Sequence, residues 1–215
     1  MTFDLLLKGG HLIDPANNID APRDLAITKG KVAAVDTDIP ATSAGKVIDV
    51  SGLVVTPGLV DIHTHMFATS GFRNAWAGDQ SILPDGFSFR SGVTTMVDTG
   101  SAGYRLFEDF RYRVLDRFDT RMYAFLNIVG MGMASNDMEQ NHADMKVEPA
   151  VAMARAHEDV IVGMKTAHYH GPEWISVDRM LEAVQALGKP SMVDFGLFPR
   201  ERPFYELVTQ RMHAG

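Results

Sequence analysis

The chain has 215 residues, of which 46% are hydrophobic and 22% charged, as is ordinary for a globular protein. Its formal net charge of −7 disfavours nucleic acid and anionic membranes as partners. There is no cysteine, which excludes disulfides and thiolate metal sites and suits a reducing cytosol. The first residues lack the features of a signal peptide, and no apolar run approaches the roughly 18 residues that span a bilayer. We therefore expect a cytoplasmic protein.

Residues 1–55 predict a small β-sandwich module. Apolar runs at residues 3–8 and 11–13 flank a glycine pair that predicts a turn. Residues 24–35 predict a hairpin around Gly30, and residues 46–50 predict one more strand. No helix-length amphipathic stretch interrupts these strands.

From residue 56 onward, short apolar strands alternate with helices. The expected strands are residues 59–62, 94–98, 122–129, 160–165 and 190–195. The expected helices are residues 104–118, a helix capped by Ser176 that ends at Gly188, and one that begins at Pro203.

This alternation indicates an α/β fold with a parallel sheet and helical crossovers. Five strand–helix units could build an open doubly wound sheet, complete as it stands. A (β/α)8 TIM-type barrel needs eight units and typically about 250 residues. Because the chain ends after a helix without a closing strand, we favour a barrel over residues 56–215, truncated after about five units. The open sheet stays as an alternative.

The strongest chemical signal is the pair His63 and His65, in the stretch DIHTH at residues 61–65. Residues i and i+2 of a strand point to the same side, so two imidazoles can converge on one ion. They end the first expected barrel strand, and barrel active sites form at this end. Neutral imidazole binds zinc and similar metals. We therefore expect both to be metal ligands.

The stretch VTPGLVDIHTH at residues 55–65 resembles the signature of the amidohydrolase superfamily. The opening DLLLKGGHLIDP at residues 4–15 is similar to the small β-sandwich that precedes the barrel in that superfamily. The likeness is greatest to the dihydroorotase-like and deacetylase branch. It implies that the chain is the N-terminal part of a metal-dependent hydrolase.

The resemblance also implies a role for Lys165, which ends the fourth expected barrel strand. Lysine at this place in the family is often carboxylated and bridges two metal ions. A free ammonium has no lone pair for a metal, whereas a carbamate supplies two anionic oxygens. The alternative is a strand-end lysine that extends to water.

The fifth expected strand departs from the family pattern. The family places a metal-binding histidine there, but this chain has Asp194. A carboxylate can replace imidazole as a ligand. Alternatively, Asp194 is not a ligand and one metal position is weakened or lost.

His168 and His170 follow Lys165 in an expected loop on the active-site face. They are candidates for substrate binding, or one of them could replace the missing histidine. The alternative is a solvated loop. Asp98 and Thr99, which end the second barrel strand, are weaker candidates for the same face.

The implied reaction is hydrolysis of an amide, cyclic amide or ester by a metal-activated water. The implied cofactor is one or two divalent ions, with zinc first and manganese or iron as alternatives. The expected partner is a small-molecule substrate, and the resemblance is compatible with a homo-oligomer. The resemblance places the general-base aspartate beyond residue 215, so no catalytic residue can be assigned. A non-catalytic barrel relative that acts as an assembly or binding module is the alternative function.

Overall fold

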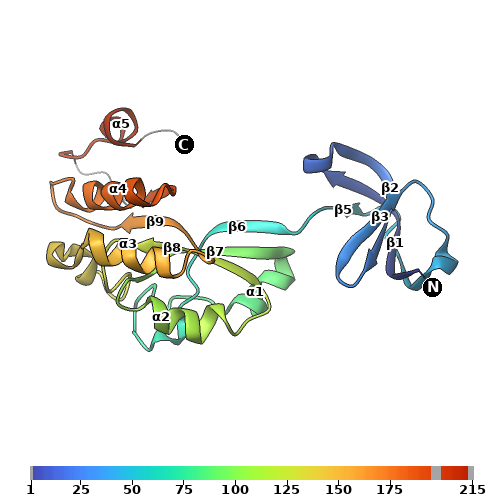
Figure 1. Ribbon diagram of the computed structural model, residues 1–215, viewed down its shortest axis with the longest axis horizontal. Helices are drawn as coiled ribbons and strands as arrows, with labels where there is room; N and C mark the ends of the chain where they lie inside the picture. The colour runs from blue at the N-terminus through green and yellow to red at the C-terminus, as the bar shows by residue number, and fades with distance from the viewer. Residues whose placement is uncertain (1, 195–199, 213–215) are drawn as a thin grey trace. The chain divides into compact units, whose positions relative to one another are not determined.

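A computed structural model of the chain describes residues 2–194 and 200–212 and divides into two compact units, Met1–Gly58 and Leu59–Gly215 (Figure 1). The strands of the first unit are β1 (Phe3–Asp14), β2 (Ile19–Thr28), β3 (Lys31–Asp36), β4 (Ala44–Asp49) and β5 (Val54–Val55). The strands of the second unit are β6 (Leu59–Thr64), β7 (Val93–Gly103), β8 (Arg121–Asn127), β9 (Ile161–Ala167) and β10 (Ser191–Asp194). Its helices are α1 (Pro84–Ser91), α2 (Phe107–Phe110), α3 (Val147–Ala156), α4 (Ile175–Leu187) and α5 (Phe204–Glu206).

The first unit is a β module. Its sheet has the order β3-β2-β1-β4, and β5 also pairs with β1. The expected hairpin is confirmed, because β2 and β3 pair in antiparallel register with Thr28 opposite Lys31. Leu6, Ala26, Ile39 and Ala44 form its small buried core.

The expected turn at Gly9 and Gly10 is wrong, because β1 runs through both glycines. Their place in the strand is an irregularity at which the register with β2 shifts between Leu7 and Gly10. Gly9 has φ +80°, a conformation that favours glycine, and its N–H donates to Asp24 Oδ1 at 2.8 Å. Because this side chain satisfies the displaced N–H, the strand bulges and continues.

The second unit is built on a parallel sheet of order β10-β9-β8-β7-β6. The strands follow one another in sequence order. A doubly wound sheet reverses its strand order at a switch point, whereas a barrel adds each strand beside the last. The sheet is therefore an arc of a (β/α) barrel, and the open-sheet alternative is wrong. The last expected strand is confirmed to Asp194, and Phe195 lies outside the described residues.

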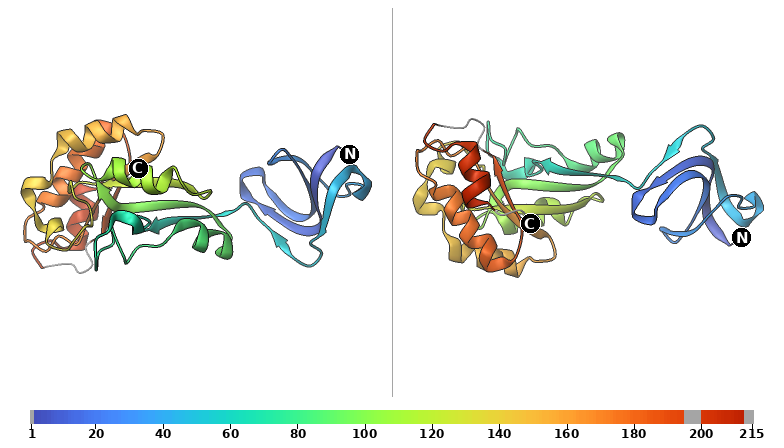
Figure 2. Two further views of the ribbon diagram at one scale, coloured as in Figure 1. Left: turned by 90° about the horizontal axis from the view of Figure 1, so that it is seen from below. Right: turned by 90° about the horizontal axis from the view of Figure 1, so that it is seen from above.

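Helices α3 and α4 lie side by side against β8 and β9 (Figures 1 and 2). Helix α4 begins at Ile175, with Trp174 as its N-cap. The expected cap at Ser176 is wrong, because this side chain is buried within the first turn. Helix α3, which the sequence pattern did not indicate, packs Val147, Ala150, Val151 and Ala154 into the core.

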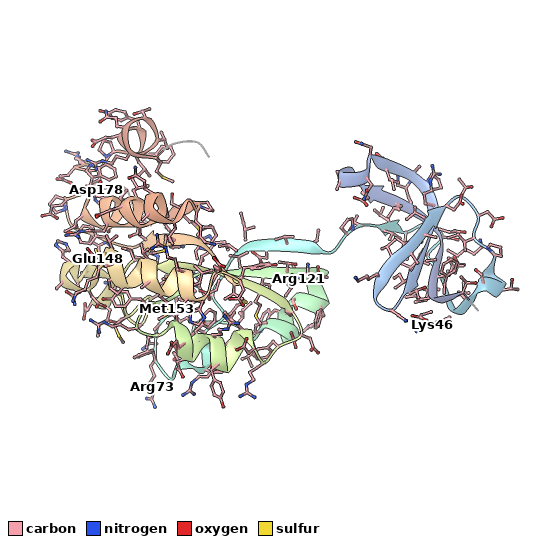
Figure 3. All side chains as sticks on the ribbon, viewed as in Figure 1. Lys46, Arg73, Arg121, Glu148, Met153 and Asp178 are labelled. Atoms are coloured by element: carbon pink, nitrogen blue, oxygen red, sulfur yellow. The ribbon has the colours of Figure 1, made fainter. Side chains whose placement is uncertain are left out.

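The parallel strands bring His63, Lys165 and Asp194 to one edge of the sheet. Each strand of the second unit ends at the edge where the following helix begins. Glu148 and Asp178 occupy the first turns of α3 and α4, and Figure 3 shows both toward the same end of the unit. Among the described residues, no helix has the length and apolar character needed to cross a membrane.

Candidate active site

His63 and His65 come from the end of β6. His63 is the fifth residue of the strand and is exposed, whereas His65 follows the strand and is half-buried. Their ring centroids lie 5.8 Å apart with the rings at 72°. The structure therefore brings the two imidazoles to the same side of the strand end, as their spacing predicts.

Two contacts fix the His65 ring. Its Nδ1 lies 3.0 Å from Ser101 Oγ, at the end of β7, and its ring packs on Trp76 at 5.1 Å between centroids. The Ser101 hydroxyl also donates to the carbonyl of Trp76 at 3.4 Å. The hydroxyl that donates to Trp76 can still accept from Nδ1, which leaves Nε2 of His65 with a lone pair. Burial, followed by the nearby charge of Lys165, lowers the pKa of His65 to about 3, so its imidazole is neutral.

Lys165 lies in β9 and is fully buried, with 0% of the residue exposed. Its Nζ lies 3.3 Å from His63 Nε2 and 3.7 Å from Asp194 Oδ2. Gly100, with φ +86°, makes room for it: a Cβ at that position would lie 3.2 Å from the Lys165 side chain. Burial lowers the pKa of Lys165, which favours the neutral amine. The alternative in which the side chain reaches water does not describe this buried residue.

Asp194 ends β10 and is half-buried. It pairs in register with Ala167 of β9, which places its carboxylate next to Lys165. Three of the four expected metal ligands, His63, Lys165 and Asp194, therefore form one cluster. The fourth, His65, stands beside His63.

His168 and His170 lie in the loop after β9 and line a cavity of about 320 Å³. Trp76 and Glu139 line the same cavity. Since Trp76 also packs on His65, the cavity adjoins the cluster. His168 Nδ1 lies 3.1 Å from Glu139 Oε2. This hydrogen bond raises the pKa of His168, and burial lowers it.

Asp98 is a buried residue of β7 that holds the backbone next to His65. It is fully buried, and its two carboxylate oxygens accept hydrogen bonds from the backbone N–H groups of Met66 and Ser101, each at 2.8 Å. These bonds join the chain after β6 to the end of β7. Burial raises the pKa of Asp98 to about 6. Asp98 therefore positions Met66 and Ser101 next to His65. It does not line the cavity.

The sequence pattern missed three residues of the site: Trp76, Ser101 and Glu139. The spacing of Asp98 and Ser101 could have indicated Ser101, because an aspartate often accepts from backbone N–H groups a few residues on. Trp76 and Glu139 lie in long segments without periodic pattern, so no sequence signal indicated them.

The residues at this edge fit a divalent metal ion only if Lys165 takes part. Among the described residues, no three histidine, aspartate or glutamate side chains gather closely enough to hold an ion. The lysine nitrogen is not itself a metal donor while it is protonated. Its separations of 3.3 Å from His63 Nε2 and 3.7 Å from Asp194 Oδ2 place it beside two side chains that can be donors. An anionic carbamate on Nζ would add the missing oxygen donors.

Comparison with known proteins agrees with this fold. The chain is 42% identical over 85 residues to a dihydroorotase from Elusimicrobium minutum, covering 39% of this chain and 19% of the relative. It is 32% identical over 146 residues to a deacetylase from Agrobacterium fabrum, covering 66% of this chain and 34% of the relative. The chain thus spans about a third or less of the length of these relatives. No family model matches it.

Solved structures show the same architecture. A dihydroorotase crystal structure superposes with a TM-score of 0.78 at 25% identity, covering 94% of this chain and 53% of the other. An adenine deaminase structure superposes with a TM-score of 0.77 at 25% identity, covering 92% and 51%. The sequence relatives, the barrel arc and the DIHTH stretch together place this chain in the amidohydrolase superfamily.

Proposed function

We propose that the protein carrying this chain is a metal-dependent hydrolase that cleaves an amide, cyclic amide or ester bond of a small molecule. The observation that carries the proposal is the cluster at the strand edge, in which buried Lys165 lies 3.3 Å from His63 Nε2 and 3.7 Å from Asp194 Oδ2. Burying an ammonium is costly unless it is neutralised or paired. A carbamate on Lys165 would remove the buried ammonium and would supply two anionic oxygens to a metal ion.

His63, His65, Lys165 and Asp194 would hold one or two divalent ions. We propose zinc, with manganese and iron as alternatives, because imidazole and carboxylate oxygens suit all three. Such an ion, when bound, would lower the pKa of water toward neutrality and polarise a carbonyl. The chain's own contribution is to supply neutral imidazoles at fixed positions, since Ser101 and Trp76 hold His65 and burial keeps its pKa low. Every relative named above is an enzyme, so nothing favours the non-catalytic alternative.

Cleavage of a small panel of substrates tests the proposal. The complete protein would be stripped with a chelator, reloaded with zinc, manganese or iron, and assayed with dihydroorotate, hydantoins, N-acetyl amino acids and their ester analogues. We expect hydrolysis of at least one compound that disappears on stripping and returns with metal. The double variant His63→Ala/His65→Ala should not recover. Hydrolysis that is indifferent to metal removal would contradict the proposal.

A further inference from the structure

Glu139 is a buried acidic residue that the proposed metal site does not use. It lies in a short 3-10 helix (Met138–Gln140) between β8 and α3, and only 3% of the residue is exposed. Its Oε2 accepts from His168 Nδ1 at 3.1 Å, while its Oε1 has no hydrogen-bond partner among the described residues. Burial raises the pKa of Glu139. A buried carboxylate with one unsatisfied oxygen is costly, so its retention calls for a reason beyond packing.

The partner of Glu139 is held in an unusual backbone conformation. His168 has φ +52°, a left-handed value that is strained for a residue other than glycine. Its N–H donates to the carbonyl of Asp194 at 3.0 Å, and its carbonyl accepts from Gln140 Nε2 at 2.9 Å. Gln140 Oε1 accepts from the N–H of His170 at 2.9 Å. The segment that carries Glu139 therefore fixes both the backbone and the ring of His168.

Both members of this pair line the cavity of about 320 Å³ that adjoins His65 through Trp76. With Nδ1 of His168 donating to Glu139, the nitrogen that remains for a ligand is Nε2. Above the raised pKa of His168 the ring is neutral; with its proton on Nδ1, Nε2 has a lone pair and accepts a hydrogen bond.

We propose that Glu139 is a positioning residue that holds the His168 ring in its Nδ1–H form, so that Nε2 accepts a hydrogen bond from an N–H group of the bound substrate. The inference rests on the proposed hydrolase function and sharpens it. An amide or cyclic amide with an N–H group offers the donor that His168 requires, and an ester lacks it. The pair therefore selects amides over esters of the same shape.

The first test reads the ring directly, without substrate. Nitrogen-15 NMR of the histidine rings of the complete, metal-loaded protein at about pH 8.5 distinguishes the two neutral forms, and the variant His168→Gln assigns the signals. We expect the Nδ1–H form of His168 in the wild type and in Glu139→Gln, whose amide oxygen can still accept. Glu139→Leu should lose the preference. A wild-type ring protonated on Nε2 would overturn the proposal even where Glu139→Leu does not fold.

The second test measures kinetics and metal together. With the fastest amide of the panel, Glu139→Leu should raise KM roughly tenfold, the effect of one lost hydrogen bond, with little change in kcat. The rate with the matched ester should fall less than the rate with the amide. Glu173→Leu is the matched control and should change neither rate, because this exposed carboxylate lies in the loop that carries His168 and accepts from Tyr169 at 2.7 Å.

A measurement of bound metal distinguishes this proposal from the alternative in which His168 is a metal ligand. It also distinguishes failure of this proposal from failure of the proposed function. Metal content should be unchanged in His168→Gln and Glu139→Leu. Loss of metal in His168→Gln would make His168 a ligand, and loss of metal in Glu139→Leu would show that Glu139 supports the metal site; either result overturns the substrate-binding role. A wild-type protein that binds metal but favours esters would overturn the pair's role alone, whereas one that neither binds metal nor hydrolyses the panel would overturn the proposed function.

Discussion

Ser101 Oγ lies 3.0 Å from His65 Nδ1, so a residue at the end of β7 orients a ring that follows β6. The same hydroxyl donates to the carbonyl of Trp76 at 3.4 Å, and the N–H of Ser101 donates to Asp98 Oδ1 at 2.8 Å. Three contacts therefore meet at one side chain and its backbone. The proposed first metal ligands depend on this support as well as on their own positions.

Ser101→Ala should weaken metal binding without removing it. Loss of the partner of Nδ1 frees the His65 ring to turn and to change its protonated nitrogen, and such losses typically cost about 10- to 100-fold in metal affinity. Zinc affinity measured by competition with a chelating dye tests this. Ser91→Ala is the control, since Ser91 Oγ donates to carbonyls of its own helix, α1. Equal affinities for Ser101→Ala and the wild type would contradict the assigned role.

Metal loading should depend on carbon dioxide through Lys165. In the proposed carbamate, the neutral amine attacks carbon dioxide, forms an N–C bond and releases a proton. We expect the stripped wild type to take up zinc faster and to a higher level when bicarbonate is added. Lys165→Gln should take up little metal with or without it. Lys189→Gln, which loses a bond from Nζ to the carbonyl of Ile161 at 2.7 Å, should behave as the wild type. Bicarbonate-independent loading of the wild type would argue against the carbamate.

Asp194 can be tested by restoring the side chain that the family pattern places there. As a ligand, Asp194 supplies an anionic oxygen, and Asp194→Asn should lower the metal content because a neutral amide is a poorer donor. Asp194→His should retain metal. Elemental analysis of both variants decides, with Asp178→Asn on α4 as a distant control. Full metal content in Asp194→Asn would show that Asp194 is not a ligand.

Asp98 should make stability depend on pH in the direction opposite to that of an ordinary carboxylate. Its folded-state pKa of about 6 lies above the usual 3.8, so the folded state binds the proton more tightly. The resulting stability is fully present below about pH 4 and is lost as the pH rises through 6, on the order of 3 kcal/mol. Asp98→Asn lacks this titration.

Denaturant unfolding of the metal-free protein from pH 4 to 7 measures this effect. The stability of the wild type relative to Asp98→Asn should fall over that range. A relative stability that rises with pH would mean that hydrogen bonds from Met66 and Ser101 outweigh burial, and that the carboxylate is ionised in the folded state.

The fold was largely predictable because its signals are periodic. The five strands of the second unit each carry an apolar run, which predicted a parallel sheet. Five strand–helix units were also compatible with an open doubly wound sheet, and the strand order in the structure decides for the barrel arc. The turn at Gly9 was mispredicted because a glycine pair is equally compatible with a bulge, and the choice depended on Asp24, which lies 15 residues away. Helix α3 lacked a cap signal, and its stripe consists mainly of alanine and valine.

The sequence could bring together only candidate residues that lie at or near strand ends. His63 and Lys165 lie near the ends of β6 and β9, Asp194 ends β10 and His65 follows β6, so a parallel sheet brings them to one edge. Glu139 reaches that edge from a 3-10 helix, and its partner His168 lies 29 residues further along the chain. Such a contact depends on how the loops fold over the strand ends, and no local pattern encodes it.

Bound metal per subunit tests the central claim most directly. The complete protein, purified after growth with added zinc, would be compared by elemental analysis with the double variant His63→Ala/His65→Ala. The account predicts one to two equivalents of zinc, manganese or iron in the wild type and loss of metal in the double variant. A folded wild-type protein that holds essentially no metal would contradict the account.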